Sequence, residues 1–70
     1  MQRKEAVALF TELVAKGYVQ PNLVSIEQRK IGKFQLKIRG DYNSEEFEIF
    51  LKNKGFSYEE TEGYLTIFKT

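Results

Sequence analysis

The segment from Lys33 to Arg39 alternates polar and apolar residues without interruption. Its apolar residues are Phe34, Leu36 and Ile38, and every position between and beside them is polar. Successive side chains of a β-strand point to opposite faces, so the pattern predicts a strand with one buried face and one polar face. A chain with such a strand must cover one side of a sheet with apolar groups and leave the other side to solvent or to a partner.

An amphipathic helix precedes this strand. Apolar residues recur at three- and four-residue spacing over residues 6–14, which predicts an apolar stripe along one side of a helix. The helix is expected to end at Lys16, because Gly17 readily takes the left-handed conformation that follows a last helical turn. Tyr18 is then placed to contact Leu13, as the residue after such a glycine commonly does.

A second amphipathic helix is predicted over residues 45–54. Its exit, Lys-Gly-Phe at residues 54–56, repeats the Lys-Gly-aromatic exit of the first helix. At its start, Asn43 or Ser44 is expected to accept hydrogen bonds from the first free backbone amides, and Glu46 is placed to complete a capping box with Asn43.

Three further strands are predicted, at residues 23–29, 56–59 and 64–69. The first pairs with residues 33–39 in one antiparallel hairpin, and the other two form a second hairpin. Each helix must bury its apolar stripe, so the sequence predicts an α+β two-layer sandwich in the order α-β-β-α-β-β. It has a four-stranded antiparallel sheet with two helices on one face. The predicted core residues are Val7, Phe10, Leu13, Val14, Val24, Ile26, Phe34, Leu36, Ile38, Phe47, Phe50, Leu51, Phe56, Leu65 and Ile67.

Seventy residues indicate one small domain, 1–70. Residues 1–40 and 41–70 each read helix-strand-strand, and the segment Gly32–Leu36 matches Gly63–Ile67 in the spacing of its inward-facing residues. An internal helix-hairpin repeat is one interpretation of this match. The other is that short amphipathic units resemble one another, and no later inference depends on the choice.

The sequence contains neither histidine nor cysteine. It therefore lacks the usual general base, the usual transition-metal ligands and a thiol nucleophile, and 70 residues leave little room for a catalytic cleft. We expect a protein that is not an enzyme and that uses no cofactor and no metal. No apolar run approaches the roughly 18 residues of a membrane span, so a soluble, cytoplasmic protein without membrane contact is expected.

The net charge of +1 hides an uneven distribution along the chain. Basic residues gather in residues 21–40, where Glu27 is the one acidic residue. Acidic residues gather in residues 41–62, where Lys52 and Lys54 are the basic ones. The chain is therefore an electric dipole along its sequence.

Basic and aromatic side chains are expected together on the sheet face that the helices leave uncovered. If the apolar residues of the central strand point to the helices, its cations point outward, and one alternation of the last strand sends its aromatic residues to the same side. Cations bind phosphates and aromatic rings stack bases, so this mixture is typical of single-stranded nucleic-acid binding. The alternative is that these charges merely solvate an antiparallel sheet. The candidate nucleic-acid-binding residues are Arg29, Lys33, Lys37, Arg39, Tyr64 and Phe68.

The stretch from residue 16 to residue 34 resembles the helix-Gly-aromatic-hairpin unit of a bacterial and archaeal small-subunit ribosomal protein that binds ribosomal RNA. The resemblance rests on Lys16-Gly17-Tyr18 and Gly32-Lys33-Phe34 and covers less than half of the chain. It implies RNA binding. Two functions thus stand side by side: a small non-catalytic module that binds RNA or single-stranded DNA, and a protein-interaction or regulatory adaptor that forms a homodimer or binds a protein partner through the same face.

Overall fold

The computed structural model describes residues 1–40 and 45–69. The predicted cap at Asn43 or Ser44 lies outside the described residues. In chain order the elements are helix α1 (Arg3–Ala15), a 3₁₀ turn (Pro21–Leu23), strands β1 (Val24–Lys30) and β2 (Lys33–Arg39), helix α2 (Glu45–Asn53), and strands β3 (Ser57–Thr61) and β4 (Tyr64–Phe68).

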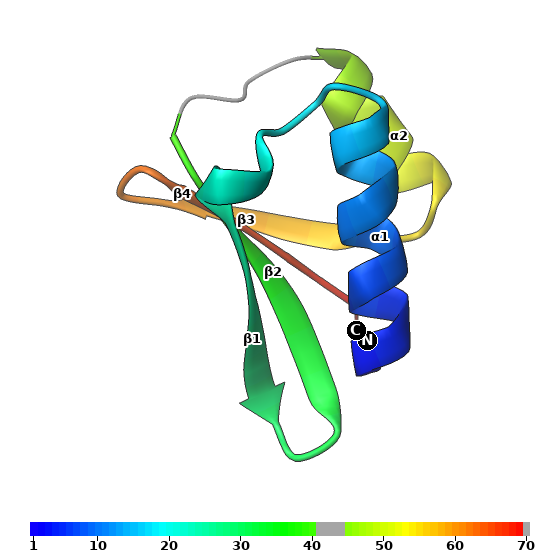
Figure 1. The fold of residues 1–70 in the computed structure, drawn as a ribbon, viewed down its shortest axis with the longest axis vertical. Coiled ribbons are helices and arrows are strands. Elements are labelled where there is room, and N and C mark those ends of the chain that lie inside the picture. The colour runs from blue at the N-terminus through cyan, green and yellow to red at the C-terminus, as the bar shows by residue number, and fades with distance from the viewer. Residues whose placement is uncertain (41–44, 70) are drawn as a thin grey trace.

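The strands form one four-stranded sheet in the order β1-β2-β4-β3, in which each neighbouring pair is antiparallel. The two hairpins therefore meet along β2 and β4, which become the central strands (Figure 1). Leu36 lies opposite Ile67, and Ile38 lies opposite Leu65. These directly opposed pairs place their apolar side chains on one face of the sheet, where both helices pack. The predicted α+β fold is confirmed.

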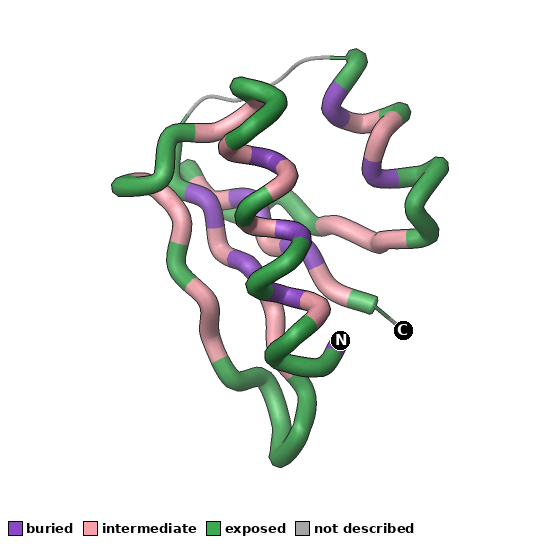
Figure 2. Tube along the Cα trace, turned by 45° about the vertical axis from the view of Figure 1, so that its right-hand side comes forward, coloured by how far each residue is buried: buried purple, intermediate pink, exposed green. Residues whose placement is uncertain are grey.

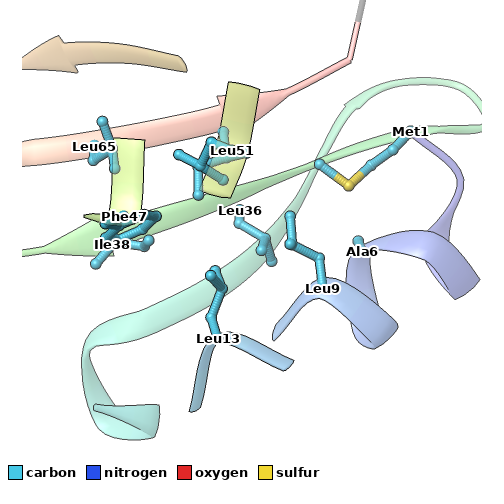
Figure 3. Packing of buried hydrophobic residues seen from close by; sticks show 10 residues of the cluster. Met1, Ala6, Leu9, Leu13, Leu36, Ile38, Phe47, Leu51 and Leu65 are labelled. Carbon is cyan, nitrogen blue, oxygen red and sulfur yellow. The ribbon is translucent and has the colours of Figure 1, made fainter. Parts of the chain in front are cut away.

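The core lies between the two helices and the central strands (Figures 2 and 3). Its buried members are Met1, Ala6, Leu9, Leu13, Leu36, Ile38, Phe47, Leu51, Leu65 and Ile67. Seven of the predicted core residues are among them, and the other predicted ones except Val7 are half-buried.

Val7 is a wrong core prediction, because 44% of its surface is exposed. The buried stripe of α1 is instead Ala6, Leu9 and Leu13, at spacings of three and four residues. A helix turns by about 100° per residue, so Val7 is rotated away from the sheet although it belongs to an apolar run. Leu9 fits the stripe better and was missing from the predicted core.

Both helices end in the same hydrogen-bonded cap. In α1, the amide of Gly17 donates to the carbonyl of Val14 at 3.0 Å, and a second bond joins the next residue, Tyr18, to Leu13 at 3.1 Å. In α2, Gly55 and the residue after it repeat the two bonds at 3.0 and 2.9 Å. The φ angles of +77° and +81° at the two glycines explain why glycine stands at both positions. The predicted exits are confirmed.

An aromatic cluster joins the carboxyl end of α1 to α2. The ring of Tyr18 stacks on the ring of Phe47 at 5.4 Å and tilts against Phe50 at 5.6 Å. On the surface nearby, the ammonium of Lys54 pairs with Glu12 at 3.4 Å. These contacts link α1 to α2 and hold the helical layer together on one side of the sheet.

Candidate nucleic-acid interface

The face of the sheet turned away from the core is called the open face below. On β2 it carries Lys37 and its alternate neighbours, because Leu36 and Ile38 are buried on the other side. The register then shows which residues of β1, β3 and β4 lie on the open face, because residues directly opposite each other share a face. The paired open-face residues are Ser25, Glu27, Lys30, Lys33, Gln35, Lys37, Arg39, Ser57, Glu59, Thr61, Tyr64, Thr66 and Phe68.

Tyr64 forms one of two cation–aromatic contacts on this face. The ammonium of Lys37 lies 4.4 Å from the centre of the Tyr64 ring, and both side chains are half-buried. Arg39 is the cross-strand partner of Tyr64, so a second cation stands beside the same ring. A hollow of about 200 Å³ adjoins this group, and it is lined by Asn22, Leu23, Val24, Ser25, Lys37, Arg39 and Tyr64.

Phe68 forms the second contact, at the other end of β4. The guanidinium carbon of Arg29 lies 4.4 Å from the centre of the Phe68 ring. Arg29 comes from β1, and β2 stands between β1 and β4, so the long side chain crosses one strand. The register of β1 against β2 shifts between Gln28 and Lys30, which leaves Arg29 unpaired in the ladder. Such a bulge redirects a side chain, and here it brings the guanidinium to the ring.

A hollow of about 200 Å³ also lies beside Phe68. We call it the Phe68 pocket, and it is lined by Met1, Arg29, Lys30, Lys33, Phe34, Phe68 and Lys69. Four of these side chains are cationic, and among the described residues none of the lining groups is a carboxylate. The pocket forms where the sheet loses a strand, because β4 ends at Phe68 while the β1–β2 hairpin continues beyond it (Figure 1).

The six predicted residues fall into two groups of three. Lys37, Arg39 and Tyr64 line one hollow, while Arg29, Lys33 and Phe68 line the other. The two groups lie at opposite ends of the central strands, so the division depends on the register of β2 against β4, which the sequence does not indicate.

Two cations of the Phe68 pocket, Lys30 and Lys69, are not among the predicted site residues. Lys30 follows the end of the predicted first strand, so alternation did not reach it. Lys69 stands alone in the sequence, and its position depends on where β4 ends. The sequence signals that could have indicated them are the position of Lys30 beside the turn at Gly32 and the position of Lys69 directly after Phe68.

Tyr64 and Phe68 lie four residues apart on the same strand and the same face. At about 3.3 Å per residue, the two rings are about 13 Å apart along β4. The carboxylates of the face stand to the sides of this line: Glu59 belongs to the edge strand β3 and Glu27 to the edge strand β1. Positive charge and rings therefore follow the central strands.

The described residues contain neither a metal-binding cluster nor a membrane-spanning helix. Within 1–40 and 45–69, no group of three or more His, Cys, Asp or Glu side chains is placed to hold a metal ion. In the same ranges, no helix has the length and apolar character needed to cross a membrane.

No family model, no curated protein and no solved structure matches this chain. A function is therefore inferred from the geometry of the open face.

Proposed function

We propose that the open face binds RNA or single-stranded DNA in the cytoplasm, without catalysing a reaction. The observation that carries the proposal is the pair of cation–aromatic contacts at 4.4 Å, one at each end of β4. Aromatic rings stack bases regardless of sequence, and neighbouring cations follow the phosphates. A four-stranded sheet with aromatic side chains on its uncovered face is also the platform on which RNA recognition motifs stack bases, which supports the proposal by analogy.

Stacking on the rings of Tyr64 and Phe68 favours a single strand over a duplex. The two rings are about 13 Å apart along the strand, so each contacts a different base. Bases that reach both rings must be unstacked from their neighbours, and paired bases in a duplex cannot lie flat on a protein sheet. Lys37 and Arg39 then bind phosphates at one end, and Arg29 and Lys33 bind them at the other.

The competing function is protein interaction through the same face, including a homodimer. Such an interface needs exposed apolar area at its centre. Tyr64 and Phe68 are half-buried already, with a cation over each ring. The surface that remains is therefore mainly charged and polar, which suits a strand of phosphates better than an apolar partner.

Salt dependence tests the proposal. A labelled oligonucleotide without secondary structure is titrated with the protein at several salt concentrations, and binding is followed by fluorescence anisotropy. Four phosphate contacts on a single strand predict a log–log slope of about −3, at about 0.7 per contact. Lys37→Ala should reduce the slope by about 0.7. Lys52→Ala, which removes an exposed lysine from α2 on the helical layer, is the matched control and should leave the slope unchanged.

The rings are tested separately from the charges. Tyr64→Leu and Phe68→Leu should each weaken binding by about 1–3 kcal/mol, which is roughly 5- to 150-fold. Tyr58→Leu is the control, because Tyr58 lies opposite Ile67 and so belongs to the helix side of the neighbouring strand. Absence of binding at low salt contradicts the proposal. So does a homodimer in sedimentation that protects Tyr64 and Phe68 from solvent, since the face is then a protein interface.

A further inference from the structure

We infer that the Phe68 pocket binds the terminal phosphate of the strand, so that the protein recognises a phosphorylated end. This inference rests on the proposed function, because the open face carries the rest of the strand. It adds a specific ligand, a phosphomonoester, at a defined place. The pocket lies at the end of β4, where a strand that follows the two rings leaves the sheet.

The charge of the pocket suits a phosphomonoester better than an internal phosphate. A phosphomonoester carries about −1.5 to −2 charges at neutral pH and three strong acceptor oxygens, whereas an internal phosphodiester carries a single charge. Four cationic side chains line the pocket, and three of them, Arg29, Lys30 and Lys33, form no ion pair with a described carboxylate. The hollow beside Tyr64 has two, Lys37 and Arg39, together with neutral Asn22 and Ser25. The two ends of the open face thus differ in the anionic charge that they can balance.

Lys30 and Lys33 provide a second observation that points to an anion. They are direct cross-strand partners at the end of the β1–β2 hairpin. Like charges placed directly opposite one another on a sheet are destabilising. Within the part of the chain that the structure describes, neither lysine forms an ion pair with a carboxylate. A dianion between the two ammonium groups would remove this repulsion.

The other two cations of the pocket are held in place by the protein. Arg29 lies over the Phe68 ring, where its guanidinium can itself stack on the base of the terminal nucleotide. Lys69 donates a hydrogen bond to Glu5 at 2.7 Å, and this pair partly offsets its charge. Arg29 is therefore the cation that orients the terminal nucleotide, while the exposed Lys30 and Lys33 are available for its phosphate.

The size and openness of the pocket agree with this ligand. A volume of about 200 Å³ is smaller than the usual 300–1,000 Å³ of sites that enclose whole ligands. It has room for a phosphate and part of a sugar while the base lies outside on Phe68. The hairpin end that forms its wall is exposed on all its residues from Gln28 to Lys33, so a strand can enter without displacing the core (Figure 2).

The test compares one oligonucleotide in three forms that differ only at their ends: a 5′-phosphate, a 3′-phosphate, and hydroxyl groups at both ends. The label is placed internally so that both ends remain free. One phosphorylated form should bind about tenfold more tightly than the hydroxyl form, which corresponds to about 1.4 kcal/mol. The double variant Lys30→Ala/Lys33→Ala should reduce this ratio to about one. Lys37→Ala should weaken all three forms by the same factor, and Lys52→Ala should change none.

The outcomes separate this inference from the proposed function. If all three forms bind equally, the pocket does not recognise the phosphate, and the open face still binds single strands. If none of the forms binds, the proposed function itself is wrong. A nucleoside monophosphate is added as a competitor in the same assay. If it displaces the phosphorylated strand at concentrations near the affinity of that strand, the pocket serves free nucleotides, and recognition of a strand end is wrong.

Discussion

The two helix-hairpin units of this protein, residues 3–39 and 45–68, agree toward the core and differ toward solvent. Both helices end in the same two cap hydrogen bonds, and both hairpins direct two aliphatic residues of their central strand into the core. Outside the core, the first hairpin carries five basic residues against Glu27, whereas the second carries Glu59, Glu60 and Glu62 and no basic residue. The inward positions therefore determine the shared fold, and the outward positions are free to specialise.

The candidate site exists only because the two units are joined along β2 and β4. The outward side of β2 supplies cations and the outward side of β4 supplies rings, so Lys37 of one hairpin reaches Tyr64 of the other. Neither hairpin contains both kinds of group on its open face. A sheet with β3 beside β2 would place carboxylates next to the cations and separate them from the rings.

Substitutions at the core positions that the two units share should have the largest effects on stability. Leu36 on β2 and Ile67 on β4 are cross-strand partners, and both are 0% exposed. Leu36→Ala and Ile67→Ala should each lower the free energy of unfolding by about 2–5 kcal/mol, because each leaves a cavity in a close-packed core. Urea denaturation followed by circular dichroism measures both values.

The double variant sharpens this prediction. Residues in contact usually show a coupling energy of about 0.5–3 kcal/mol, so the combined loss should differ from the sum of the two single losses. A loss below about 1 kcal/mol at one position, with the full loss at the other, would show that one unit supports the fold and the other is only attached to it.

How far the sequence predicts this molecule depends on the kind of signal. The alternation of polar and apolar residues predicts the observed bounds of β2, and the Lys-Gly-aromatic segments predict where both helices end. These predictions succeed because each depends on residues close together in the sequence. Val7 was misplaced because a continuous apolar run blurs the direction of a helical stripe. The six candidate residues were predicted to share one face, and the structure places them there in two groups. Their binding of a nucleic acid stays a prediction.

The Phe68 pocket shows why the rest of the site could not be predicted. Arg29 reaches Phe68 because the register of β1 against β2 shifts beside it. The sequence of β1 contains no glycine or proline, the residues that commonly mark a bulge, so this shift could not be predicted. Lys30 and Lys69 line the same pocket although they are 39 positions apart in the sequence, which depends on the order of the strands. Strand order is a long-range property, and local patterns do not encode it.

The difference in charge between the two hairpins can be reversed at one position of the open face. Glu59 belongs to the open face beside Thr66, and Glu60 belongs to the helix side beside Leu65. Glu59→Lys should strengthen oligonucleotide binding a few-fold and steepen the log–log salt slope by about 0.7, because it adds one cation to the face. Glu60→Lys makes the same change of net charge on the same strand and is the matched control. Equal effects of the two variants would show that binding follows net charge and not the open face.

The smallest effect concerns an ion pair that joins the two units, Glu5 of α1 with Lys69 after β4. The hydrogen bond from Lys69 lowers the pKa of Glu5 below its ordinary value of 4.5, against a smaller opposing effect of burial. A carboxyl with a lowered pKa in the folded state stabilises the fold above its unfolded pKa, and this contribution is lost as the pH falls through the lower, folded value. The side chains remain 44% and 36% exposed, so solvent screening keeps the contribution below about 1 kcal/mol.

Glu5→Gln should therefore lower the melting temperature slightly at pH 6, and the difference in melting temperature from the wild type should disappear as the pH falls below about 4.5. In a Lys69→Met background the same substitution should leave no such pH-dependent gap, because the hydrogen bond that lowers the pKa is absent. A gap that persists in that background would mean that Glu5 stabilises α1 by itself and that the pair does not join the two units.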